Sequence, residues 1–398
     1  MLASKVYRLY IINIIQKMRC EMKKRNLTYI VTIIISAIFL FALNRYAISG
    51  AEIFPHSVKT ACAKIISVDG KSCAKLGEFS SEVIICTAKI TSGEHKGNIV
   101  DVYQEYNSKI ASTTLIKEGD NVIIKNYPLD EMGIYWAVDN HRRTPSLFVL
   151  TLIFALAVIV LGKAKGLRTM VSLIYTCISV FCVFIPWILS GKNIYAGVIL
   201  VCVFIILMTL LLVNGWDRKT FCAALGCVGG VVVAAIITLV FSHIMKFTGY
   251  TNEHSYYLTS LPGSPNLCAI AFSAVLIGAV GAVMDVAMSM SSSLYELSIK
   301  VPDISFKSLV SSGLSIGRDM MGTMANTLVL AYVGSSLTSV LLICTYADSF
   351  SDILNREAIA YEIVQAIAGS MGILLAIPIT AFVCGMLYTH KKGDEKYV

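Results

Sequence analysis

Long apolar runs separated by short polar segments dominate this chain. Each run has roughly the 17–25 residues that an α-helix needs to cross the bilayer core. They predict a mainly α, polytopic transmembrane helix bundle with about eight spans. These expected spans are residues 27–43, 146–161, 169–189, 194–213, 220–243, 267–290, 321–346 and 363–387. The apolar spacing of residues 306–319 predicts, in addition, a short helix lying on the membrane surface.

Residues 44–145 interrupt this pattern between the first and second spans. They contain short β-type runs separated by turn sequences such as SGEHKGN and KEGDN. Strands of this kind predict a small β-rich domain, either an antiparallel barrel or a sandwich, with an OB-like arrangement as one option. Acidic and basic residues balance within it, so we expect a docking or gating module more than a domain that captures substrate. The expected strands are 62–68, 82–91, 97–104, 120–126 and 132–138.

Composition and charge fit a membrane protein. The chain is 56% hydrophobic and 15% charged, whereas soluble domains contain roughly 25% charged residues. Basic residues gather on alternate loops, which places both termini in the cytoplasm and explains the net charge of +8 without a nucleic-acid partner. Arg45 and Tyr46 follow the first run where a signal peptidase needs small residues, so we expect an uncleaved anchor. The expected organisation is a basic cytoplasmic N-terminus (1–26), an anchor (27–43), an extracytoplasmic domain (44–145), a seven-span membrane domain (146–388) and a cytoplasmic tail (389–398).

Neither the spacing of the cysteines nor any short motif indicates a cofactor. Most of the 12 cysteines lie in apolar runs, where they act as small apolar side chains. Cys62, Cys73 and Cys86 lie in the β-rich segment, and their odd number permits at most one disulfide bond among them. No His and Cys spacing predicts a metal site, and the sequence contains no G-x-x-x-x-G-K-[ST] or H-E-x-x-H motif.

Asp285 is a carboxylate inside an apolar run, and it is the strongest candidate for function. A charge at such a depth costs about 2.5–3.5 kcal/mol unless it meets a partner or water, and intramembrane charges are more often functional than structural. The next run begins with Arg318 and Asp319 at an expected matching depth, so Arg318 is a candidate partner for Asp285. Such a pair could instead lock two helices in register. The candidate transport or ion-site residues are Asp285, Ser289, Arg318, Asp319, Thr323 and Asn326.

Small residues recur at helical spacing in several runs, and such faces let membrane helices pack closely. Glu362 and Gln365 enter the last run near its expected outer end. The expected helix-packing glycines are Gly226, Gly230, Gly278, Gly281 and Gly372.

Three segments carry a resemblance to a known family. GAVMDVAMSMSSSLYEL (281–297) and SIGRDMMGTMANTLVLAYVG (315–334) resemble the YibE/F-like family of multispanning bacterial membrane proteins, and so does HRRTPSLFVLTLIFALAVIVLGKAKGLR (141–168). The resemblance is most specific in GRDMMGTM. It implies an integral, multi-pass protein of the bacterial cell membrane with an outer domain, and it implies no substrate.

Three functions are compatible with these observations. The first is a transporter or permease for an unidentified solute or ion, with a polar site between the sixth and seventh spans. The second is an intramembrane aspartyl-type hydrolase in which Asp285 and Asp319 share a proton, although neither lies in a Gly-x-Gly-Asp motif. The third is a non-transporting assembly or sensor protein. The expected partners are the lipid bilayer, a small solute or ion, and a membrane or extracytoplasmic protein.

Overall fold

The computed structural model describes residues 27–49, 60–76, 79–106, 115–126, 136–251, 253–259 and 264–389. The chain divides into two compact units. One unit comprises Met1–Ile53 and Leu161–Val398, and the other comprises Phe54–Val160. The expected N-terminus (1–26) and nearly all of the expected tail (389–398) lie outside the described residues.

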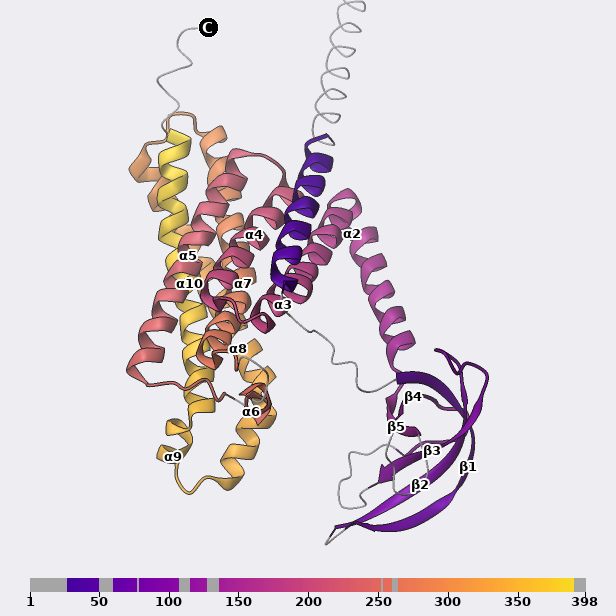
Figure 1. Cartoon of the computed structure of the whole chain (residues 1–398). Coiled ribbons are helices and arrows are strands. Elements are labelled where there is room, and N and C mark those ends of the chain that lie inside the picture. Colours follow the sequence, from indigo (N-terminus) through magenta and orange to yellow (C-terminus); the bar gives the residue numbers. More distant parts are fainter. Residues whose placement is uncertain are drawn as a thin grey trace, which may run out of the picture. The chain divides into compact units, whose positions relative to one another are not determined.

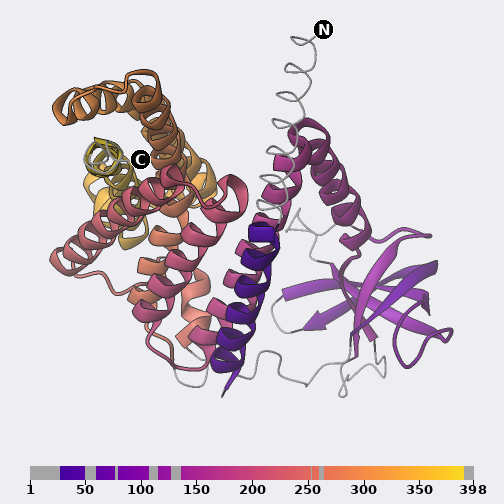
Figure 2. The same cartoon turned by 90° about the horizontal axis from the view of Figure 1, so that it is seen from above.

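The strands form a closed barrel in the order β1-β2-β3-β5-β4, with β4 pairing back onto β1 (Figures 1 and 2). The pairs are antiparallel except for β3 and β5, which run parallel. A small five-stranded Greek-key barrel is the arrangement of the OB fold. The predicted small barrel is therefore confirmed. The strands are β1 (Thr60–Leu76), β2 (Phe79–Ile90), β3 (Ile99–Tyr106), β4 (Asn121–Asn126) and β5 (Trp136–His141).

The barrel encloses a small apolar core. Side chains alternate between the two faces of a strand, so Val122 and Ile124 of β4 and Cys86 and Ala88 of β2 point inward and are fully buried. The pairing of β1 with β2 shifts register beside Gly70, whose φ of 147° suits glycine. Cys62 and Cys86 are free thiols, while the side chain of Cys73 lies outside the described residues.

The other unit contains most of the long apolar helices, and several of them pack side by side (Figure 1); residues 144–160 of α2 belong to the barrel unit. In the described part of the chain, seven helices, counting α2 to α3 as one, are long and apolar enough to cross a membrane. The protein is thus a membrane protein with a helical bundle. Its helices are the N-terminal helix (Leu27–Ile48), α2 (Thr144–Ile178), a π-helical turn (Ser179–Phe184), α3 (Ile185–Leu189), α4 (Ile194–Asn214), α5 (Arg218–Ile244), α6 (Glu253–Thr259), α7 (Leu267–Lys300), α8 (Phe306–Tyr346), α9 (Phe350–Asn355) and α10 (Glu357–Thr389).

The second and third predicted spans fall in one helical segment, residues 144–189. The segment is broken at Lys163, whose φ of 49° and ψ of −128° are not helical. This break lies in the basic stretch between the two predicted spans. The difference between eight predicted runs and seven helices therefore rests on this one position.

The helices α7 and α8 are longer than the apolar runs that predict them. α7 continues to Lys300, and α8 begins at Phe306, where the Ser305 side chain caps it by accepting a hydrogen bond from the backbone N–H of Ser308 at 3.2 Å. The predicted separate surface helix at 306–319 is wrong. Those residues form the first turns of α8, because no proline interrupts the helix and Gly313 and Gly317 let it pack against Ala381 and Ile377 of α10.

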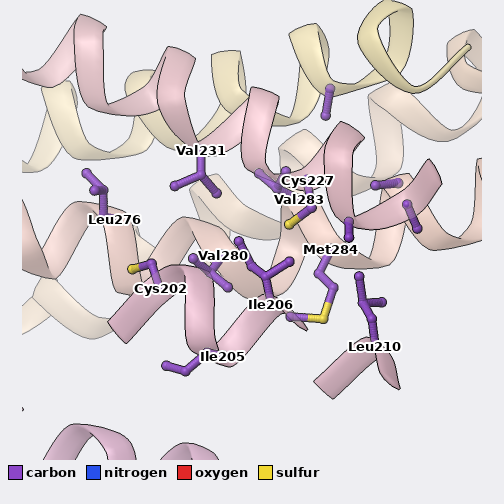
Figure 3. Close-up of a cluster of buried hydrophobic side chains, with 14 of the residues drawn as sticks. Cys202, Ile205, Ile206, Leu210, Cys227, Val231, Leu276, Val280, Val283 and Met284 are labelled. Carbon is purple, nitrogen blue, oxygen red and sulfur yellow. The ribbon is translucent and has the colours of Figure 1, made fainter. Parts of the chain in front are cut away.

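The core of the bundle lies between α4, α5, α7 and α10. Figure 3 shows Ile206 of α4, Cys227 and Val231 of α5, and Val280 and Val283 of α7 pointing toward one another. These side chains are apolar and buried. They hold α7 in place, and Asp285 is two residues from Val283 on the same helix.

Close contact between α5 and α10 depends on glycine. A β-carbon on Gly230 would lie 2.7 Å from the carbonyl oxygen of Gly372, and one on Gly372 would lie 3.0 Å from the carbonyl oxygen of Gly230. A β-carbon on Gly226 would lie 2.0 Å from the Thr380 hydroxyl oxygen. The two backbones therefore approach more closely than any other residue would allow.

Candidate functional site

Asp285 lies on the exposed side of α7. Its neighbours Met284 and Val286 are buried in the bundle core, and each residue of a helix is rotated by about 100° from the last, so the carboxylate points away from that core. Ser289, one turn further along, is exposed on the same side. The pair forms a polar, uncovered strip on one side of α7.

The polar residues of α8 are also exposed. Arg318, Asp319, Thr323 and Asn326 all lie on uncovered parts of the helix. The Nε of Arg318 donates to the Leu314 carbonyl oxygen at 3.3 Å, and the Thr323 hydroxyl donates to the Met320 carbonyl oxygen at 3.0 Å. These groups bind their own helix rather than a neighbouring one.

The expected pair between Asp285 and Arg318 is not formed. Among the described residues, the ion pairs within 4.0 Å join Lys125 to Asp139, His141 to Asp120, and Arg356 to Asp352. Both members of the expected pair are described, and no hydrogen bond joins Asp285 to Arg318 or to Asp319. Asp285 therefore has no charged partner among the residues that the structure describes.

The glycines of α7 differ in their surroundings. A β-carbon on Gly278 would lie 2.5 Å from the Tyr332 hydroxyl oxygen, so α8 covers α7 there. A β-carbon on Gly281 would meet nothing within 4 Å, so Gly281 does not serve helix packing within the chain. The space beside α7 opens between Gly278 and Asp285.

A polar cavity of about 480 Å³ lies between α7, α8 and α10, beside α6 and the residues that precede it. Glu362 of α10 is the one charged side chain among the described residues that line it, and it is half-buried. The polar residues around it are Thr251, Ser255, Ser335, Ser336, Ser339, Tyr361 and Gln365, and the apolar ones include Leu258, Ile270, Val340 and Ile343.

Glu362 differs from the carboxylate that precedes it on α10. Glu357 accepts three hydrogen bonds, from the backbone N–H groups of Thr248 and Gly249 at 2.8 and 2.7 Å and from the Thr248 hydroxyl at 2.7 Å. Glu362, which is five residues further on, accepts none from any described residue and forms no ion pair with one. Its charge is available to something in the cavity.

The cavity was missed by the sequence analysis, although part of its signal is in the sequence. Ser335, Ser336 and Ser339 follow one another at helical spacing in the predicted seventh span, and Glu362 and Gln365 do so in the last. Each set alone is ordinary in a membrane helix. Their meeting depends on the crossing of α8 over α10, which no local pattern specifies.

Comparison with known proteins identifies the family of the chain. A search of curated proteins found no match, and a search of solved structures found none either. The family profile described as YibE/F-like protein matches residues 150–390, more than half of the chain, and this stretch contains Asp285, Arg318 and the cavity. The chain therefore belongs to the YibE/F-like protein family.

Proposed function

We propose that the protein is a transporter or permease for a small solute or ion, with Asp285 on the transport path. The observation that carries this proposal is the carboxylate itself, which is exposed on a helix of membrane-spanning length and has no ion-pair or hydrogen-bond partner in the described segments. Charged residues inside a membrane are costly and are usually retained because they bind or move something. Ser289, Asp319, Thr323 and Asn326 supply further polar groups on the two helices.

The proposed location is the bacterial plasma membrane, with residues 44–145 outside the cell and both termini inside. Support comes from the distribution of basic residues. They gather before residue 27, at residues 163–168 and at residues 300–318, which are the segments that this orientation places on the cytoplasmic side, as the positive-inside rule requires. In this orientation Asp285 lies toward the cytoplasmic side of the bundle. Glu362 and the polar cavity then lie toward the outside.

The aspartyl hydrolase is a weaker alternative. It requires Asp285 and Asp319 to share a proton through a hydrogen bond. No such bond is present among the described residues, and both side chains are exposed. An assembly or sensor protein that presents the barrel is the third alternative, and it predicts that loss of residues 44–145 matters while loss of the Asp285 charge does not.

The test is a paired metabolite and elemental profile of cells and medium, measured by mass spectrometry. The cells express the wild type, Asp285→Asn or an empty vector at matched membrane abundance. Asp348→Asn is the control variant, because Asp348 is an exposed carboxylate between α8 and α9. We expect the wild type and Asp348→Asn to redistribute the same solute or ion. The activity of Asp285→Asn should be at least 10-fold lower than that of the wild type.

Two results would oppose the proposal. Redistribution that survives Asp285→Asn would remove Asp285 from the path. No redistribution by well-expressed wild type, together with a phenotype that depends only on residues 44–145, would favour the assembly or sensor function.

A further inference from the structure

We propose that the cavity between α7, α8 and α10 is a binding site for a small organic cation, with the Glu362 carboxylate as its counter-ion. The inference rests on what the described cavity walls contain. They offer one carboxylate, several hydroxyl groups and one side-chain amide, together with apolar side chains, and no lysine, arginine or histidine.

The charge balance of the walls selects a cation over an anion. Glu362 accepts no hydrogen bond from a described residue and forms no ion pair with one, so nothing in the described part of the chain neutralises its negative charge. An anion would meet repulsion from this carboxylate without a compensating positive group. A monovalent cation would be held by one carboxylate at the membrane depth where an uncompensated charge is costly.

Size and donor set select an organic cation over a metal ion. A cavity of about 480 Å³ falls in the range of sites for small organic molecules and exceeds what a bare ion requires. Calcium and magnesium sites use six or more oxygen ligands, usually with several carboxylates. No group of three His, Cys, Asp or Glu residues able to hold a metal is present in the described part of the chain.

The walls are held in place before any ligand arrives. Glu357 fixes Thr248 and Gly249 to the start of α10, and Gly249 lines the cavity. The Tyr361 hydroxyl donates to the carbonyl oxygen of Ala271 on α7, which ties α10 to α7. The hydroxyls of Ser335 and Ser336 donate to the Tyr332 carbonyl oxygen at 2.9 and 2.8 Å, which leaves their oxygens able to accept a hydrogen bond from a ligand.

This inference deepens the proposed transport function. It rests on that function in one respect, namely that organic cations are the class of substrate that is transported. Binding can nevertheless be measured without transport. The residues involved are also separate, because Asp285 and Arg318 do not line this cavity. Failure of one proposal is therefore distinguishable from failure of the other.

The test is a binding titration of the full-length protein in nanodiscs, followed by isothermal calorimetry and by the thermal unfolding midpoint. The probes are choline and its neutral carbon isostere 3,3-dimethylbutan-1-ol, which have nearly the same shape and differ in charge. Two variants are compared with the wild type. Glu362→Gln removes the charge and keeps the size, and Ser339→Leu fills the cavity and keeps the charge; Asp348→Asn is the matched control.

We expect choline to bind the wild type and Asp348→Asn equally, and at least 10-fold more tightly than the neutral isostere. Glu362→Gln should lose this preference for the cation, and Ser339→Leu should bind both probes more weakly. Equal choline affinity in the wild type and Glu362→Gln would overturn the inference, as would a folded wild type that binds neither probe at millimolar concentration. Binding without transport in cells would leave the site standing and remove the transport function.

Discussion

Glu357 at the start of α10 accepts a hydrogen bond from both the backbone N–H and the hydroxyl of Thr248, at 2.8 and 2.7 Å. Thr248 follows α5, more than one hundred residues earlier in the chain. The carboxylate also lies in the first turn of α10, where negative charge is favoured by the helix dipole. One side chain thus caps a helix and fixes the connection after α5 to it.

Replacing Glu357 should lower the stability of the bundle. Glu357→Ala removes the acceptor of three hydrogen bonds, and because the site is partly exposed we expect a loss of about 1–2 kcal/mol. Glu357→Gln keeps one acceptor oxygen and should lose less. Thermal unfolding of the purified protein measures both, and Asp348→Asn is the exposed carboxylate control. Equal midpoints for wild type and Glu357→Ala would contradict this account.

Replacing glycine by alanine should change the stability of the protein differently at two positions. Gly230→Ala places a β-carbon 2.7 Å from the carbonyl oxygen of Gly372, so α5 and α10 must separate, at a cost of about 1–3 kcal/mol. Gly281→Ala meets nothing within 4 Å and should be neutral or stabilising by up to about 1 kcal/mol, since alanine favours helix. Unfolding midpoints of the two variants provide the comparison, and a Gly230→Ala midpoint equal to that of the wild type would show that α5 and α10 pack less closely than described.

Asp285 and Arg318 should behave as independent residues in a double-mutant cycle. Because no ion pair joins them, the effects of Asp285→Asn and Arg318→Gln on stability should add, with a coupling free energy below about 0.5 kcal/mol. Thr248→Val combined with Glu357→Gln is the positive control, since those side chains are in contact at 2.7 Å. Coupling between Asp285 and Arg318 as large as that of the control pair would restore the salt bridge expected from the sequence.

The Cys86 thiol of the barrel should react slowly with alkylating reagents, and it should lower the stability of the fold at high pH. Burial raises the pKa of the Cys86 thiol, and the Asp69 carboxylate adds to the rise. At pH 8 we expect Cys86 to be alkylated more slowly than the less buried Cys62, and Asp69→Asn should accelerate its alkylation; peptide mapping by mass spectrometry measures the rates.

The same shift has a defined sign for stability. A raised pKa means that the unfolded chain loses the Cys86 proton first, so the neutral thiol stabilises the fold below the ordinary value of 9.0 and this contribution is lost as the pH rises above it. Cys86→Ala should remove this part of the pH dependence. An unchanged alkaline loss of stability in that variant would assign the effect to other groups.

Much of the fold follows from local patterns. The apolar runs predict where the long helices lie, because length and hydropathy suffice to place an apolar helix in a bilayer. Alternation and turn residues likewise predict the strands of the barrel; the last strand is expected at 132–138 and lies at Trp136–His141. Helix ends follow less directly from the sequence, since α8 begins at Phe306, in a segment whose apolar spacing predicts a separate surface helix.

The candidate site could be predicted only in part. Asp285 was found from its own sequence context, because a charge in an apolar run stands out. That Asp285 and Arg318 do not pair could not be predicted in this way, since matching two residues in depth says nothing of which faces of α7 and α8 meet. The Glu362 cavity depends on the same missing information, together with a bond from Glu357 to Thr248 that spans more than one hundred residues.

The break at Lys163 bears on whether the chain crosses the membrane an even or an odd number of times. If the chain reverses there, the segment 144–189 crosses twice, the crossings become even in number, and both ends of the protein face the same compartment. If the chain continues through, the number is odd, and the ends face opposite compartments. The orientation proposed above, with both termini inside, therefore requires the chain to reverse at Lys163.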